Sequence, residues 1–166
     1  MKATKTARQK IRNYTRYLNY TLDIYREVQS FINHVVFDNN DKIFTLDQSK
    51  ARNNYVERLI HSTSKNQAVY TDFGSRFYKL PSYLRRYAIA QAIGHVSSHV
   101  SRVALWENNR KGRRPVFNPG CKGFPVFYRD NMSKWISRSK VSLKLYNGSD
   151  WIWFILPFEP VNSDRF

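Results

Sequence analysis

The sequence predicts an α+β protein in which a helical part precedes an antiparallel β part. Two stripes of apolar residues recur at spacings of three and four, as on one face of a helix. The first stripe consists of Leu18, Leu22, Tyr25, Val28, Ile32 and Val35, and the second of Ile89, Ile93, Val96, Val100, Val103 and Trp106. Further along, residues 141–146 and 151–156 are rich in β-branched and aromatic residues and flank a short loop. This order of patterns is typical of the α+β class.

Three helices are expected before Pro115. The first begins near Tyr14 and ends at the Asn pair that starts with Asn39. A second, weaker helical pattern covers residues 46–62. The third and clearest helix begins at Pro81, a residue that suits the first helical turn. Pro115 prevents any continuation of this helix because proline cannot donate a backbone hydrogen bond.

The β part is expected to be an incomplete sheet. Residues 147–150 predict a four-residue hairpin loop. On the first strand the apolar residues Val141, Leu143 and Leu145 should point to the buried face of the sheet. They alternate with Ser142, Lys144 and Tyr146, which should point to the solvent-exposed face. The second strand, 151–156, is apolar on both faces, so both should be covered. No third strand is evident beside this hairpin, and an isolated hairpin is marginally stable in water.

The net charge favours a polyanionic partner. The chain has 28 Lys+Arg against 12 Asp+Glu, which gives a formal net charge of +16. Such charge exceeds what solubility requires, and phosphate neutralisation with release of counterions would turn it into affinity for a nucleic acid. The alternatives are a protein that is merely basic and an anionic membrane surface. The short basic segment 4–13 could form either an edge strand or a basic arm.

Composition indicates a folded protein outside the membrane. Hydrophobic residues make up 42% and aromatic residues 16%, unlike a disordered basic arm. Cys121 is the single cysteine, so an internal disulfide is excluded. We find no apolar run of about 18 residues and no signal-peptide core. The expected location is therefore the cytoplasm, in association with the prokaryotic nucleoid, with no membrane partner.

No residues of this chain are expected to be catalytic or to bind a metal ion. Asp23 and Glu27 are four residues apart, but the clustered carboxylates of a metal-dependent nuclease are missing. His95 and His99 also have helical metal-ligand spacing, but the Glu of the zinc-protease motif and a third ligand are lacking. Cys121 lies in a Pro-Gly-Cys-Lys-Gly loop without an adjacent base. Polar packing and solvated acids explain these residues better.

Two segments interleave basic and aromatic residues, residues 76–87 and 122–135. Arg and Lys can contact phosphates while aromatic faces stack on bases. The alternative is that the aromatic residues lie in the core with solvated cations around them. The residues that we expect to contact the nucleic-acid backbone or to stack on bases are Arg12, Arg76, Lys79, Tyr83, Lys111, Arg113, Arg114, Lys122, Tyr128, Arg129, Lys134 and Trp135.

Three blocks resemble the amino-terminal region of TnpB proteins, the OrfB proteins of transposable elements, which are similar to type V CRISPR effectors. The blocks are LPSYLRRYAIAQAIGHVSSHVSRVALWEN (80–108), FPVFYRDNMSK (124–134) and VSLKLYNGSDWIWFILPF (141–158). The resemblance covers about residues 5–160. It depends on the order of the Tyr-Leu-Arg-Arg helix, the Trp-Glu ending, the Phe-Pro strand and the Gly-x-x-Trp hairpin.

The resemblance implies an oligonucleotide-binding β-barrel, the wedge domain, with a helical recognition domain inserted after its first strand. Residues 1–13 would supply the first wedge strand and basic arm, 14–115 the recognition domain, and 116–166 the returning strands of an incomplete barrel. The RuvC nuclease domain of the family has no counterpart in this sequence. Its cleavage chemistry, with the Mg²⁺ that it needs, is therefore not assigned to this chain.

The resemblance also implies a place for DNA recognition. In the family the start of the long recognition helix lies near a short motif beside the DNA target. Arg86, with Arg85 beside it, falls closest to that place, and Gln91 or Ala90 occupies the position of a family glutamine. Gln91 can still donate to and accept from a base edge. The loop that contains Thr45 and Gln48 corresponds to a second motif-facing segment.

These observations lead to a first hypothesis and two alternatives. The first is the recognition half of an RNA-guided nuclease, which holds a guide RNA and target double-stranded DNA while base pairing recognises the sequence. Cleavage would come from a separate RuvC-domain polypeptide or would have been lost. The second is a stand-alone basic RNA- or DNA-binding module. The third, a metal-dependent enzyme built on Asp23, Glu27, His95 and His99, has the least support.

Overall fold

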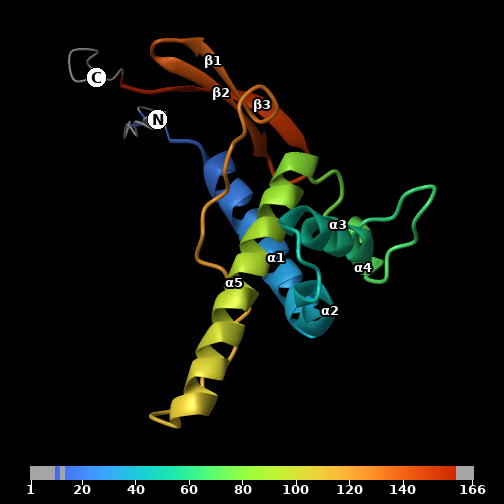
Figure 1. The fold of residues 1–166 in the computed structure, drawn as a ribbon. Helices are drawn as coiled ribbons and strands as arrows, with labels where there is room; N and C mark the ends of the chain where they lie inside the picture. Colours follow the sequence, from blue (N-terminus) through green and yellow to red (C-terminus); the bar gives the residue numbers. More distant parts are fainter. Residues whose placement is uncertain (1–9, 12–13, 160–166) are drawn as a thin grey trace, which may run out of the picture. The chain divides into compact units, whose positions relative to one another are not determined.

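The chain folds into helices followed by a three-stranded antiparallel sheet, which confirms the α+β class (Figure 1). A computed structural model describes residues 10–11 and 14–159. The described elements are α1 (Arg16–Asp38), α2 (Asn40–Phe44), α3 (Ser49–Ile60), α4 (Asp72–Arg76), α5 (Ser82–Asn109), β1 (Ser133–Ser137), β2 (Lys140–Tyr146) and β3 (Trp151–Pro157). The three predicted helices correspond to α1, α3 and α5. The short α2 and α4 were not predicted, because five residues are too few to show a helical period.

Two compact units divide the chain, and they are named here by their main elements. The helical unit is Leu22–Val126, and the sheet unit comprises the described residues up to Thr21 and from Phe127 onward. Residues 116–126 therefore belong with the helices, whereas the sequence placed them with the strands. The reason is side-chain contact: Phe117 stacks on Phe37 with ring centroids 4.3 Å apart.

The apolar stripe of α1 forms the centre of the helical unit. Its predicted members Tyr25, Val28, Ile32 and Val35 are all buried. A polar ladder runs beside them, in which Gln29 Nε2 donates to the Ala88 carbonyl on α5 at 3.1 Å. In the other hydrogen bonds of this ladder, Tyr25 Oη donates to Gln29 Oε1, Gln29 Nε2 donates to Asn33 Oδ1, and Asn33 Nδ2 donates to the Pro119 carbonyl. This ladder fixes the register of α1 against α5 and the segment after it.

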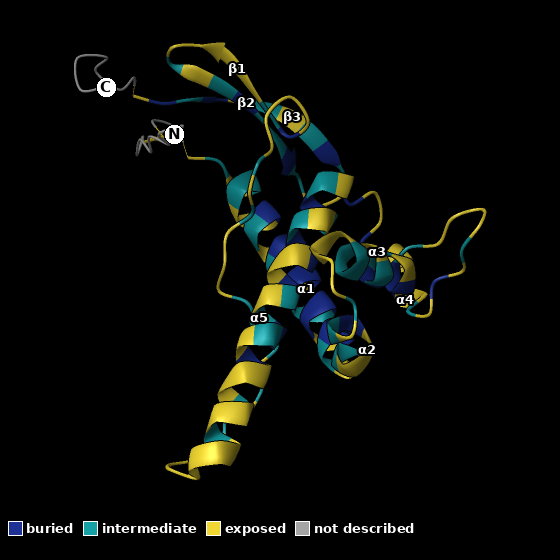
Figure 2. Cartoon of the chain, viewed as in Figure 1, coloured by how far each residue is buried: buried dark blue, intermediate teal, exposed yellow. Residues whose placement is uncertain are grey.

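The stripe of α5 is buried over only part of the helix. Ile89 and Val96 are buried, but the buried face ends at His99, and Val100 and Leu105 are exposed. The predicted stripe is therefore buried at Ile89 and Val96 and half-buried at Val103 and Trp106, with Val100 exposed between them. Figure 2 shows the last turns of α5 largely exposed. The second half of the helix is covered less completely than the first, since Val103 and Trp106 there are only half-buried.

The sheet has a third strand that the sequence did not reveal. Strand β1 pairs antiparallel with β2, and β2 pairs with β3, in the order β1-β2-β3. The segment SKWIS of β1 is short, largely polar and interrupted by a register shift between Trp135 and Ser137. The Phe-Pro segment at 124–128, expected as a strand, has no regular structure. Ile11 forms an antiparallel bridge with Phe158, whereas the rest of segment 4–13 apart from Lys10 lies outside the described residues.

The two faces of the sheet differ from the predicted pattern. Cross-strand partners share a face, so Leu145 and Leu156 lie on the buried face, against which Tyr17 of α1 packs its ring on Phe154 at 5.5 Å. The opposite face carries Lys134, Ser142, Lys144, Trp153 and Ile155. Ser142 was expected to be solvent-exposed but is buried, since it is a small residue on the central strand between larger side chains. Strand β3 was expected to be covered on both faces, yet Trp153 and Ile155 are exposed.

Candidate nucleic-acid interface

The start of α5 carries the two arginines that the sequence singled out. Pro81 is the residue before the helix, with φ of −56°, and α5 begins at Ser82. Consecutive residues project about 100° apart around a helix. Arg85 and Arg86 therefore cannot share one environment, and the structure gives them different ones.

Arg85 is part of an ion pair between α5 and α3. Its Nε and Nη2 donate to Glu57 Oε1 at 2.9 and 2.6 Å. The Arg85 side chain is 11% exposed and that of Glu57 26%. Arg85 thus holds the two helices together. Its expected role in DNA recognition conflicts with this pairing, and Arg86 is left as the cation that faces outward.

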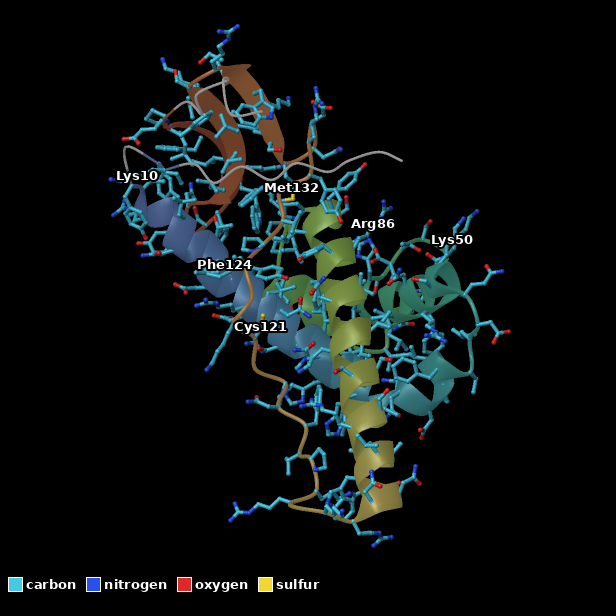
Figure 3. The ribbon with its side chains drawn as sticks, turned by 60° about the vertical axis from the view of Figure 1, so that its left-hand side comes forward. Lys10, Lys50, Arg86, Cys121, Phe124 and Met132 are labelled. Carbon is cyan, nitrogen blue, oxygen red and sulfur yellow. The ribbon has the colours of Figure 1, made fainter. Side chains whose placement is uncertain are left out.

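Arg86 lines a groove between α3 and α5 with a volume of about 540 Å³. Lys50, in the first turn of α3, provides a second cation on its wall, and Figure 3 shows the two residues on these two helices. The Arg86 guanidinium carbon lies 5.8 Å from the centre of the Tyr83 ring, a cation–π contact that orients it. The remaining lining residues are Ser49, Asn53, Asn54, Glu57 and Ile89. Lys50, Asn53 and Asn54 were not predicted to contribute, because only packing of α3 on α5 brings them beside Arg86.

Two acceptors below the groove surface lack partners. Asn53 Oδ1 and Glu57 Oε2 are buried and have no hydrogen bond to any described residue. They lie four residues apart on α3, hence on one side of the helix. A buried polar atom without a partner costs about 1–3 kcal/mol. The groove therefore combines two surface cations with unsatisfied acceptors beneath them.

Thr45 and Gln48 lie in the link between α2 and α3. Both are exposed, and Thr45 Oγ1 donates to the Lys42 carbonyl at 2.8 Å. Gln48 is the residue immediately before α3, two positions ahead of Lys50. Of the two, Gln48 is the closer in sequence to the groove.

Gln91 lines a different cavity from Arg86. That cavity has a volume of about 290 Å³ and lies between α1, α5 and the segment from Gly120 to Phe124, which includes Lys122. Arg26, which the sequence analysis missed, donates to the Gly123 and Lys122 carbonyls at 3.4 and 3.5 Å. Because residues 86 and 91 are separated by about 140° around the helix, the structure does not bring them into one site.

The remaining predicted cations of the helical unit are dispersed. Arg76 pairs with Glu27 at 3.4 Å, and both side chains are about half exposed. Lys79 has a positive φ of 58°, and its ammonium lies 5.5 Å from the Tyr78 ring. Neither residue lines the groove between α3 and α5.

The basic link after α5 is held by side-chain contacts. The Trp106 indole N–H donates to the Gly112 carbonyl at 3.0 Å, and the guanidinium groups of Arg110 and Arg114 lie over its ring. Arg114 also contacts Glu107 at 3.2 Å. Lys111 and Arg113 are exposed. The link therefore presents its cations from a turn that is held by these contacts.

In the sheet unit, basic and aromatic residues meet across strands. The Lys134 ammonium lies 4.6 Å from the centre of the Trp153 ring. Trp135 is exposed on the opposite face, where it contacts Phe158 edge-on at 5.4 Å. Tyr128 and Arg129 are also exposed, and Arg129 is 3.8 Å from Asp130. Trp153 was not named from the sequence, because its exposure follows from strand register. Arg12 lies outside the described residues.

His99 is buried and packs against aromatic rings. Its ring contacts Phe37 and Phe117 at 5.7 and 5.2 Å. Burial lowers the His99 pKa, and the nearby charges of Arg102, His95 and Arg114 lower it further. Within the described ranges, no group of three or more His, Cys, Asp or Glu residues could hold a metal ion. The His99 ring lies among these aromatic side chains.

Comparison with known proteins gives a family for this chain. Residues 5–147 match the model of the Aq_aa04 family. The chain belongs to that family. The matched range contains α1 to α5, β1 and β2, and thus the whole groove between α3 and α5. No match was found among the curated proteins or among the solved structures. None of the helices that the structure describes is long and apolar enough to cross a membrane.

Proposed function

We propose that this chain binds nucleic acid, as the guide-RNA and target-DNA recognition part of a TnpB-like RNA-guided system. The observation that carries the proposal is the groove between α3 and α5, which both Lys50 and Arg86 line. A net charge of +16 provides the long-range attraction. Cleavage, where it occurs, comes from a separate RuvC-domain polypeptide with its own Mg²⁺.

The groove supports binding of a phosphate backbone because its cations are not neutralised by its acid. Glu57 is the carboxylate among the lining residues, and it is engaged by Arg85. Arg85 already binds one oxygen of Glu57, which reduces the competition of this carboxylate with a phosphate for Lys50 and Arg86. Phosphate contacts of this kind fix the register of a protein on nucleic acid.

The sheet unit supports the finer part of the proposal. Its three strands form an open antiparallel sheet, and Ile11 bridges to the residue that follows β3. An oligonucleotide-binding barrel closes a sheet of this kind with further strands. We propose that β1, β2 and β3 belong to such a wedge domain and that its exposed Trp153 and Lys134 contact the guide RNA.

The experiment is co-expression of the chain with any RuvC-domain polypeptide encoded beside its gene, followed by purification and sequencing of bound RNA. The proposal expects one defined RNA species and retention of the partner. Lys50→Ala and Arg86→Ala should each reduce the RNA recovered. Arg58→Ala is the matched control, since Arg58 is exposed on α3 but does not line the groove. A chain that purifies without RNA and fails to bind added RNA or DNA would overturn the proposal.

A second candidate is a stand-alone RNA- or DNA-binding module. The observation that favours it is the separation of Arg86 and Gln91 into different cavities, which argues against a single motif-recognition surface at the start of α5. The two candidates differ in their genes and ligands. An unrelated operon, together with equal affinity for DNA with and without any flanking motif, would favour the stand-alone module.

A further inference from the structure

We infer that the groove between α3 and α5 holds a nucleotide whose base carries an exocyclic amino group. This inference depends on the proposed function, and it adds base recognition to a site otherwise expected to bind only phosphate. The groove offers two kinds of recognition within one cavity, cations on its wall and acceptors beneath them. A nucleotide with an amino group presents the matching pair, an anionic phosphate and a hydrogen-bond donor.

The cations select the anionic part of the ligand. Lys50 comes from the first turn of α3 and Arg86 from the second turn of α5, so the two lie on opposite walls. Arg86 rests on the Tyr83 ring, which limits its freedom before binding. A phosphate between the two walls gains charge-assisted hydrogen bonds from both.

The acceptors select the base. Asn53 Oδ1 and Glu57 Oε2 have no hydrogen-bond partner in the described part of the chain, and an ionised carboxylate can only accept. Adenine, cytosine and guanine each carry an amino donor, whereas uracil and thymine carry a carbonyl oxygen in its place. A carbonyl facing these two oxygens would leave three acceptors without a donor, which a buried site disfavours.

The size and lining of the groove fit one nucleotide. A volume of about 540 Å³ is within the range of small-molecule sites, roughly 300–1,000 Å³. Ile89 is the apolar residue of the lining, and it is buried. Ser49 and Asn54 add polar groups at the lining.

The test compares labelled oligocytidine with oligouridine of equal length, by fluorescence anisotropy with the full chain. These RNAs share charge, sugar and ring size, but cytosine has an amino donor where uracil has an oxygen acceptor. We expect cytidine to bind about tenfold more tightly, as one satisfied hydrogen bond to a charged acceptor would give. Asn53→Leu, which keeps the side-chain size but removes the acceptor, should reduce the preference to less than about threefold.

Two further variants separate base recognition from phosphate binding. Lys50→Ala should weaken both RNAs by the same factor and keep their ratio. Asn53→Asp retains an acceptor at the same place, so it should keep the cytidine preference while its charge weakens both RNAs. Arg58→Ala should change neither. Circular dichroism of each variant verifies that the helices are intact.

The outcomes distinguish this inference from the proposed function. Equal binding of the two RNAs by the unmodified chain, or an unchanged preference in a folded Asn53→Leu variant, overturns base recognition and leaves nucleic-acid binding standing. Failure of every RNA and DNA to bind overturns both.

Discussion

The helical unit and the sheet unit use similar residues in different ways. Both carry cations beside aromatic rings, as in Arg86 on Tyr83 and Lys134 on Trp153. In the helical unit, Arg86 lines a groove together with Glu57, which forms a partly buried ion pair with Arg85. In the sheet unit, Lys134 and Trp153 lie on an exposed face with Ile155 beside them. The arginine of the helical unit thus lines a groove, whereas the lysine of the sheet unit lies on an exposed strand surface.

The largest expected difference between the units is in how much an isoleucine-to-alanine substitution lowers the free energy of unfolding. Ile32 is fully buried in the helical unit, whereas Ile155 is 53% exposed on the sheet. Ile32→Ala should lower the free energy of unfolding by about 3 kcal/mol, since it removes buried surface and leaves a cavity. Ile155→Ala should change it by less than about 0.5 kcal/mol. Urea unfolding followed by circular dichroism measures the free energy of unfolding of both variants. Equal decreases in the two variants would contradict this difference between the units.

The ion pair of Arg85 with Glu57 should contribute to stability more than a surface pair. Arg85→Ala leaves the partly buried Glu57 without its donor, so we expect a loss of about 2 kcal/mol, between the values for surface and buried pairs. Glu57→Gln and the double variant complete a thermodynamic cycle that isolates the interaction. A coupling energy near zero would show that Arg85 is available for a ligand after all.

Trp153 should contribute to nucleic-acid binding through stacking on a base, with little electrostatic contribution. Trp153→Ala is expected to weaken single-stranded nucleic-acid binding by about 1–2 kcal/mol, because a base loses its aromatic contact. The dependence of affinity on salt should stay constant, since no phosphate contact is removed. Ile155→Ala on the same face is the control. A fall in the salt slope with Trp153→Ala would instead indicate that the ring serves to position Lys134.

The smallest expected effect is a dependence of the helical unit's stability on pH through His99. Its folded pKa lies below the ordinary histidine value of 6.5 because the charged form is disfavoured by burial and by neighbouring arginines. Between the folded pKa and 6.5 the unfolded chain binds more protons, so stability rises with pH there. The contribution is complete above 6.5 and is lost as pH falls toward the folded pKa. Melting temperatures of the chain and of His99→Leu across this interval test the sign, and parallel curves would contradict it.

Periodic patterns predicted most of the helices and the hairpin. The stripe from Tyr25 to Val35 and the Pro81 start of α5 both appear in the structure, because helical spacing and proline chemistry act locally. The third strand was missed since β1 is short, polar and bulged, and its pairing with β2 depends on residues further along the chain. The structure does not bring the predicted motif-recognition residues into one place. Arg86 faces a groove, but Arg85 is engaged by Glu57, and Gln91 faces elsewhere.

The sequence by itself determined the charge, the α+β order, the main helices and the turn between β2 and β3. Each of these depends on composition or on neighbours within about one helical turn or hairpin. Only the tertiary structure decided that Lys50 and Asn53 stand beside Arg86, because α3 and α5 are joined through Arg85 and Glu57, 28 positions apart. It also decided the exposure of Trp153, because strand pairing selects which face each side chain occupies. Contacts across such separations depend on the packing of whole elements, which no local pattern encodes.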